Sequence, residues 1–220
     1  MNILITGCCG FIGYHLAKKL TTKYNIVGLD NLNSYYDKNY KYARLKKLKS
    51  NKNFKFLKID IADKKKLDNI FVKFKFDIVI NLAAQPGVRL SISNPSIYFQ
   101  NNIKGFFNLI ECVKKNRIKH FIFASSSSVY GNQKKYPVKE EADISKPLSF
   151  YGATKICNEA MAYSYSNMFK IPITCLRFFT VYGPENRPDM AMYKFTKNII
   201  SNKKIELFNK GNFFRDFTYI

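Results

Sequence analysis

The chain has 220 residues, of which 46% are hydrophobic, and this is enough for one domain with a buried core and part of a second. It carries 37 lysines and arginines against 15 acidic residues, a formal net charge of +22. The basic residues are mostly lysines scattered along the expected helices, so we expect a weak attraction for anionic small molecules rather than a nucleic-acid interface.

Cysteine usage and hydropathy exclude several further classes. The five cysteines form no C-x-x-C pair and have no histidine at ligand spacing, so we expect no metal site and no disulfide framework. No charged leader precedes the first predicted strand, and no uncharged apolar run approaches the roughly 20 residues of a membrane-spanning helix. We therefore expect a soluble, cytoplasmic protein with no membrane partner.

The N-terminus predicts a strand that turns into a helix at a glycine-rich loop. Residues 2–6 are apolar and β-branched, and Gly7, Gly10 and Gly13 follow, with apolar residues at helical spacing after them. Here Gly7 permits a tight turn, Gly10 lets backbone approach a pyrophosphate, and Gly13 packs the helix on the strand. The first N–H groups of such a helix suit phosphates. The spacing is one residue longer than G-x-G-x-x-G, and the alternative is an ordinary glycine-rich turn.

The second predicted strand, residues 24–30, ends in a carboxylate. Asp30 lies 30 − 13 = 17 positions after Gly13, about where an acid holds the adenosine ribose hydroxyls. A carboxylate there repels a 2′-phosphate, so we expect NAD rather than NADP. A polar loop follows at 31–37, and residues 38–50 predict a strongly basic helix that we interpret as a solvated face.

Strands and helices alternate through the rest of the chain. Strands are expected at 54–61, 77–82, 119–124 and 173–177, and helices at 63–73, 94–115, 151–169 and 189–202, with Asp63 and Asn94 as N-caps and a strand or turn within 207–220. This alternation predicts an α/β fold with a Rossmann-type doubly wound parallel sheet. Ligands bind such sheets at the carboxyl ends of the strands.

The fifth strand leads into four serines, residues 125–128, and a tyrosine–lysine pair follows them on a helix. Tyr151 and Lys155 are four residues apart and share one helix face. An ammonium near a phenol lowers the phenol's pKa from about 10, which makes tyrosine a usable general base, while a serine hydroxyl shares the proton with the substrate. A Y-x-x-x-K pair alone fits an ordinary amphipathic helix; here all these elements converge at the strand ends.

Six sequence strings together resemble the extended short-chain dehydrogenase/reductase family, and within it the UDP-glucuronate 4-epimerases. The strings are residues 81–89, 125–131, 151–155, 177–184, 187–191 and 215–220. The resemblance implies that Tyr151 is the catalytic base, that Lys155 is its partner, and that Ser126 holds the reacting hydroxyl. Ser127 and Ser128 are rivals for the role of Ser126.

The resemblance also implies the ligand contacts. The residues that would bind NAD are Gly7, Gly10, Phe11, Ile12, Gly13, Asp30, Asn31, Asp60, Ile61, Leu82, Ala83, Ala84, Asn102, Tyr151 and Lys155. Those that would bind a UDP-sugar are Arg89, Ser126, Ser127, Ser128, Tyr151, Thr180, Arg187 and Arg215.

The implied reaction inverts C4 of UDP-glucuronate through a 4-keto sugar to give UDP-galacturonate. Dehydratases and decarboxylases of the family carry an acid just after the first hydroxyl residue, whereas this chain has Ser127 and Ser128 there. These hydroxyls and Thr180 could bind the sugar carboxylate and restrain its loss. Another nucleotide-sugar epimerase or dehydratase is the alternative.

Family members extend beyond the position of Ile220. We therefore expect residues 1–177 to form the NAD-binding domain and 178–220 to begin an incomplete substrate domain. An inactive, truncated NAD-binding module is a further alternative. The resemblance also implies a homodimer through helices near 95–115 and 151–169.

Overall fold

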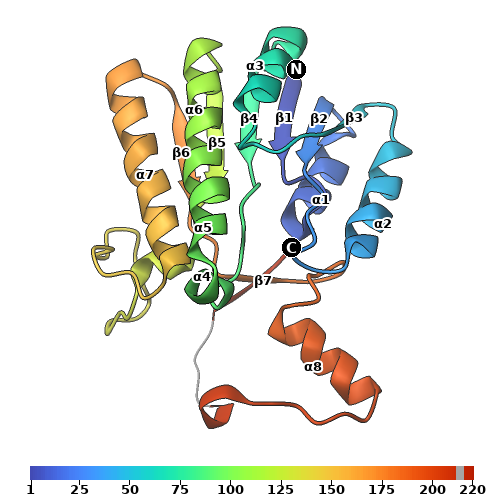
Figure 1. The fold of residues 1–220 in the computed structure, drawn as a ribbon, viewed down its shortest axis with the longest axis vertical. Coiled ribbons are helices and arrows are strands. Elements are labelled where there is room, and N and C mark those ends of the chain that lie inside the picture. The colour runs from blue at the N-terminus through green and yellow to red at the C-terminus, as the bar shows by residue number, and fades with distance from the viewer. Residues whose placement is uncertain (212–215) are drawn as a thin grey trace.

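A single parallel sheet organises the chain. The computed structural model describes residues 1–211 and 216–220 (Figure 1). The sheet has the order β3-β2-β1-β4-β5-β6, and all of its neighbouring strands pair in parallel. Its strands are β1 Asn2–Thr6, β2 Asn25–Asp30, β3 Phe54–Lys58, β4 Ile78–Asn81, β5 His120–Ala124 and β6 Ile173–Leu176. This is the strand order of a doubly wound dinucleotide-binding sheet, so the predicted fold class is confirmed.

Helices cover both faces of this sheet and enclose two apolar cores. The helices are α1 Phe11–Leu20, α2 Lys38–Lys49, α3 Lys64–Phe74, α4 Leu90–Ser93, α5 Pro95–Tyr98, α6 Gly105–Lys115, α7 Phe150–Phe169 and α8 Ala191–Ile200. One core joins the sheet to α3, α6 and α7, with Leu109 and Phe121 fully buried in it. The other joins the sheet to α1 and α2, with Ile5 and Ala17 fully buried. Burial on both faces explains the near-continuous apolar runs of the strands.

One predicted boundary differs from the structure, and one predicted N-cap lacks its side-chain hydrogen bond. Asp63 caps α3 as expected, accepting a hydrogen bond from the Lys66 N–H at 3.1 Å. Asn94 stands at the N-cap position of α5, before Pro95 as predicted, but its side chain accepts from the Ser96 hydroxyl at 2.9 Å and makes no hydrogen bond to a backbone N–H of the helix. The third strand ends early, since the Asp60 carboxylate accepts from the Ala62 N–H at 2.8 Å and turns the chain.

The helix expected at 94–115 is interrupted by a π-helical segment, Phe99–Lys104, between α5 and α6. Such segments shift the register of every following side chain and often occur at functional sites.

The interpretation of residues 38–50 as a solvated face holds for Lys38, Lys46, Lys47 and Lys49, which are exposed, but is wrong for the other two basic residues. Lys41 is only 6% exposed and Arg44 is fully buried. Both stand at helical spacing with Leu45 and Leu48, on the face of α2 that packs against the sheet. Their side chains extend toward loops at the carboxyl ends of the strands.

A second, small sheet follows β6. It contains β7 Thr180–Tyr182 and β8 Phe217–Tyr219, paired in parallel. Figure 1 shows α4, β7 and α8 beyond the carboxyl ends of the main strands. The domain division at residue 177 stays a prediction. No helix within the described residues is long and apolar enough to cross a membrane.

Candidate active site

The glycine loop between β1 and α1 is held in contact with the exit of β4. Gly7 has φ +71°, and a Cβ there would lie 2.8 Å from the Ala83 nitrogen. A Cβ on Gly13 would lie 2.1 Å from the Gly7 carbonyl oxygen, so the two roles predicted for these glycines agree with the geometry. A Cβ on Gly10 would meet only that same oxygen, at 3.1 Å.

Carboxylates follow the next two strands at the same edge. Asp30, at the end of β2, is buried and accepts hydrogen bonds from the Cys9 N–H at 3.0 Å and the Leu32 N–H at 2.8 Å. Asp60 lies beyond β3 and accepts from the Asn31 amide at 2.8 Å. The acid on β2 thus also fixes the glycine loop.

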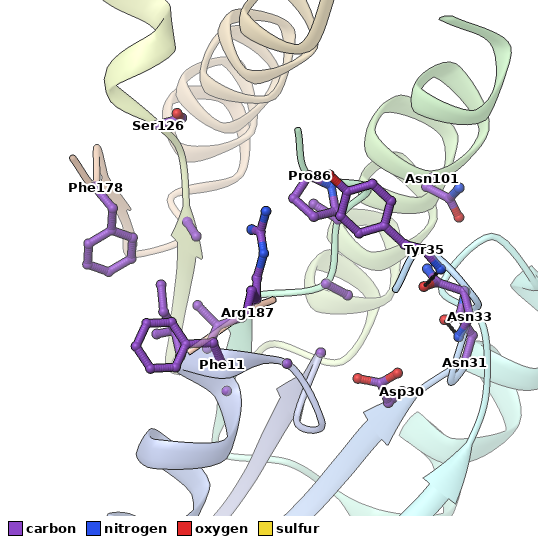
Figure 2. A pocket seen from close by; sticks show the side chains of 18 of the residues that line it. Phe11, Asp30, Asn31, Asn33, Tyr35, Pro86, Asn101, Ser126, Phe178 and Arg187 are labelled. Atoms are coloured by element: carbon purple, nitrogen blue, oxygen red, sulfur yellow. Dashed lines mark hydrogen bonds between the residues drawn. The ribbon is translucent and has the colours of Figure 1, made fainter. Parts of the chain in front are cut away.

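These elements open into one cavity of about 250 Å³, which Figure 2 shows from close by. Fourteen of the fifteen residues predicted to bind the cofactor line it: Gly7, Gly10, Phe11, Ile12, Gly13, Asp30, Asn31, Asp60, Ile61, Leu82, Ala83, Ala84, Tyr151 and Lys155. Ser126 and Arg187 also line it, so the predicted catalytic and cofactor residues share one cavity.

Asn102, the fifteenth residue, is not in the lining of this cavity among the described residues. Its buried amide accepts from the Gln85 N–H at 2.7 Å and donates to the Thr154 hydroxyl at 3.2 Å. Its neighbour Asn101 lines the cavity instead. Asn102 therefore joins the β4 exit to α7, which is a structural role.

Four predicted substrate contacts are also outside the cavity lining, as far as the described residues go: Arg89, Ser127, Ser128 and Thr180. Ser128 donates its backbone N–H to the Ser126 hydroxyl at 3.1 Å, so it positions the serine that does line the cavity. Thr180 belongs to β7, and its N–H donates to the Asp216 carbonyl at 3.3 Å. Arg215 lies outside the described residues.

The predicted lowering of the Tyr151 pKa by Lys155 is not what this geometry produces. Burial raises the pKa of Tyr151, and the Ser126 hydroxyl and the Arg187 charge oppose that rise only in part. The Lys155 ammonium lies 5.9 Å from the centre of the phenol ring and donates to the Ala124 carbonyl at 2.8 Å. Burial lowers the pKa of Lys155 to about 8.

Arg187 brings a positive charge into the middle of the cavity. Figure 2 shows its guanidinium between Phe11 and Pro86. It donates to the Asp189 carboxylate at 3.0 and 2.6 Å, and the Tyr35 hydroxyl donates to the same carboxylate at 3.0 Å. The pair fixes the direction of the guanidinium and reduces its net charge.

Fifteen further residues line the cavity without having been predicted, and they lie on loops, on β2, β5, β7 and α2, and in the π-helical segment. They are Leu29, Asn33, Tyr35, Tyr36, Lys41, Ile59, Pro86, Asn101, Ala124, Ser125, Phe178, Phe179, Val181, Asn186 and Met190. Lys41 donates to the Asn33 carbonyl at 3.1 Å and to its side-chain oxygen at 2.8 Å. Its spacing with Leu45 was a usable signal that it faces inward.

The residues present fit NAD. The glycine loop leaves no side chain between the backbone and a ligand, the first N–H groups of α1 have no partner within that helix, and a carboxylate ends β2. Tyr151, Lys155 and Ser126 stand at the other end of the same cavity.

Fold and site together define a dinucleotide-binding α/β protein with a tyrosine–lysine–serine site. Residues 3–220 match the model of the NAD dependent epimerase/dehydratase family, and the chain belongs to that family. The resemblance drawn from the sequence is therefore confirmed.

Named relatives span the whole chain. It is 49% identical to Protein CapI of Staphylococcus aureus, over 100% of this chain and 66% of that protein. It is 43% identical to a UDP-glucuronate 4-epimerase of Thermodesulfobacterium geofontis, over 99% and 67%. The structure of a UDP-glucuronic acid 4-epimerase from Bacillus cereus, in complex with UDP-glucuronic acid and NAD, superposes with a TM-score of 0.93 at 39% identity, covering 100% of this chain and 69% of that one. The chain thus spans about two thirds of the length of these relatives.

The position of Asp30 predicts a preference for NAD over NADP that depends on its charge. Asp30→Asn removes the repulsion of a 2′-phosphate and leaves Lys41 on the cavity wall, so we expect the ratio of NAD to NADP affinity to fall about tenfold, which is roughly 1.4 kcal/mol. Isothermal titration with both cofactors measures this. Asp68→Asn, on α3 and outside the cavity lining of the described residues, is the control, and an unchanged ratio in Asp30→Asn would contradict the assignment.

Proposed function

We propose that the chain carries the active site of a nucleotide-sugar 4-epimerase, and that its substrate is UDP-glucuronate, converted to UDP-galacturonate. The observation that carries the proposal is one cavity that joins a dinucleotide cradle to Ser126, Tyr151, Lys155 and Arg187. The named 4-epimerases among the relatives support it.

The chain's own residues divide the chemistry between them. NAD, when bound, supplies the reversible oxidation and reduction at C4. Tyr151 takes the proton from the sugar O4 and returns it, and Ser126 binds the same oxygen and orients it. Lys155, held on the Ala124 carbonyl, places a positive charge beside these two groups. One tyrosine serves both directions, so no separate acid is needed.

The cavity favours an anionic sugar. Arg187 lines the cavity, and because its Nε and Nη2 donate to Asp189, its Nη1 remains to donate a charge-assisted hydrogen bond to a ligand carboxylate. Ser127, Ser128 and Thr180, which we expected to bind the sugar carboxylate, are outside the cavity lining. We therefore assign this task to Arg187 in place of the three hydroxyls.

Removal of the phenol tests the proposed chemistry. Tyr151→Phe should lower kcat for UDP-glucuronate roughly a hundredfold to ten-thousandfold, the usual contribution of a positioned acid–base group. The product is quantified by chromatography of the released UDP-sugars. Tyr42→Phe removes the same hydroxyl from an exposed position on α2 and should leave kcat unchanged. A chain that binds NAD but converts no UDP-sugar would instead be the inactive module.

Arg187→Met tests the choice of sugar. We expect kcat/KM to fall about tenfold to a hundredfold more for UDP-glucuronate than for UDP-glucose, because a hydrogen bond to a charged group contributes about 1.5–3 kcal/mol. The ratio between the two sugars cancels any general damage to the fold. Thr180→Val should affect both sugars equally; equal losses in Arg187→Met would refute the carboxylate assignment.

We also propose a homodimer through the helices of residues 95–115 and 151–169. Phe99 in the π-helical segment, Phe107 on α6 and Tyr163 on α7 are exposed, and large exposed apolar side chains are candidates for an interface. Phe107→Asp should convert the dimer to a monomer in sedimentation velocity experiments, whereas Val72→Asp, exposed on α3, should not. A monomeric unmodified chain at micromolar concentration would exclude this dimer.

A further inference from the structure

Glu159 lies behind the proposed catalytic residues, outside the cavity lining of the described residues. It is on α7 at i+4 from Lys155 and i+8 from Tyr151, so the three side chains share one helix face. The Ser125 hydroxyl donates to its carboxylate at 2.5 Å. Ser125 directly precedes Ser126, and a group that holds one restricts the other.

The last residue of β5 and the two residues after it face the side of α7 that carries Tyr151, Lys155 and Glu159. The Lys155 ammonium donates to the Ala124 carbonyl at 2.8 Å, and Ser125 donates to Glu159 as above. The next residue, Ser126, has its hydroxyl close enough to Tyr151 to lower its pKa. Ala124 and Ser125 thus contact α7 at Lys155 and Glu159, and the next residue, Ser126, lines the cavity together with Tyr151.

Arg177 fixes Glu159 from the opposite side. Its Nε donates to the two carboxylate oxygens at 3.0 and 3.2 Å, and its Nη2 donates at 2.8 Å, a geometry that leaves the carboxylate little freedom to rotate. Burial raises the pKa of Glu159, but the hydrogen bonds from Arg177 and Ser125 outweigh it and hold that pKa below the ordinary value. Glu159 is therefore an anion at neutral pH.

The charges that face Lys155 come from several elements. Glu159, on α7, is the anion that acts on Lys155, and the nearby cations are each paired with a carboxylate, Arg177 with Glu159 and Arg187 with Asp189. Cys175 on β6 is a neutral thiol, since burial raises its pKa to about 12. Tyr151, one turn before Lys155, is a phenol whose ring meets that of Tyr98 edge to face at 6.1 Å. Removal of Glu159 would take away the anion that acts on Lys155 and leave the Arg177 guanidinium without this carboxylate.

We propose that Glu159 is a positioning residue of the epimerase reaction: it fixes Ser125, and through it Ser126, against α7, and it supplies the negative charge that stabilises the Lys155 ammonium. The inference rests on the proposed function. It concerns a group that touches neither substrate nor cofactor and acts only through its neighbours.

Two substitutions separate the two parts of this role. Glu159→Gln removes the charge but keeps an oxygen that accepts from Ser125, and Ser125→Ala removes the contact but keeps the charge. In the NAD-loaded chain we expect Glu159→Gln to lower kcat about tenfold with KM for UDP-glucuronate within about twofold, and to move the alkaline limb of the kcat–pH profile down by about one unit. Ser125→Ala should lower kcat several-fold with that limb unmoved.

Titration of the Lys155 ε-carbon by NMR, in protein labelled on lysine, gives a readout independent of turnover. Its midpoint should fall in Glu159→Gln and stay in place in Ser125→Ala. The matched control is Glu111→Gln. Glu111 lies on α6, away from the cavity, and its carboxylate accepts a hydrogen bond from the hydroxyl of Tyr165 on α7 at 2.6 Å. This substitution should leave kcat, pH profile and midpoint unchanged.

The inference is overturned if Glu159→Gln leaves both the Lys155 titration midpoint and the alkaline limb of the kcat–pH profile in place. It is also overturned if Glu111→Gln shifts them as Glu159→Gln does. If Glu159→Gln does not fold because Arg177 is left unpaired, Glu159→Gln combined with Arg177→Met removes both charges; unchanged kcat in that chain also overturns it. An unmodified chain that converts no UDP-sugar refutes the epimerase proposal instead, and the NMR midpoints then decide the role of Glu159 alone.

Discussion

A close backbone approach that only glycine permits governs this structure. Gly13 lies so near the Gly7 carbonyl that a Cβ would come within 2.1 Å of it, so α1 begins directly against the end of β1. The first N–H groups of the helix consequently open toward the cavity rather than toward solvent. Asp30 accepts from the Cys9 N–H, and β2 therefore braces the same loop. The loop is fixed by the strands on either side before any ligand binds.

Arg44 extends this constraint to the far side of the cavity. Its buried guanidinium donates to the Cys9 carbonyl at 3.0 Å and to the Glu185 carbonyl at 2.7 Å. One side chain thus connects the glycine loop to the segment that carries Arg187. Burying a guanidinium costs free energy that its hydrogen bonds must offset, and its Nε has no hydrogen-bond partner within the described residues. The arrangement favours a fixed spacing between the cofactor cradle and the substrate side over maximal stability.

The fold and most of the cavity could be predicted because they depend on local signals. Apolar runs predict buried parallel strands, and parallel strands bring their carboxyl ends, hence Asp30 and Ser126, to one edge. The predictions that failed concern side chains whose positions depend on helix register and on contacts between distant segments. Asn102 was assigned through the family resemblance, and the structure places it in a π-helical segment where its neighbour Asn101 lines the cavity. Helix periodicity indicates that Lys41 faces inward, but it does not reveal the Asn33 loop that accepts its hydrogen bonds.

The tyrosine–lysine pair shows the same limit in its electrostatics. Spacing alone suggests an ammonium that stabilises a phenolate, yet burial acts on both groups at once: it raises the pKa of Tyr151 and lowers that of Lys155 to about 8. The higher pKa of Tyr151 and the lower pKa of Lys155 both favour the uncharged forms, so the pair by itself does not yield a strong base near neutral pH. The surrounding charges then decide the protonation states. Arg187 favours the phenolate, and the anion at Glu159 favours the ammonium. The reactive state is therefore a property of the packed site and not of the four-residue spacing.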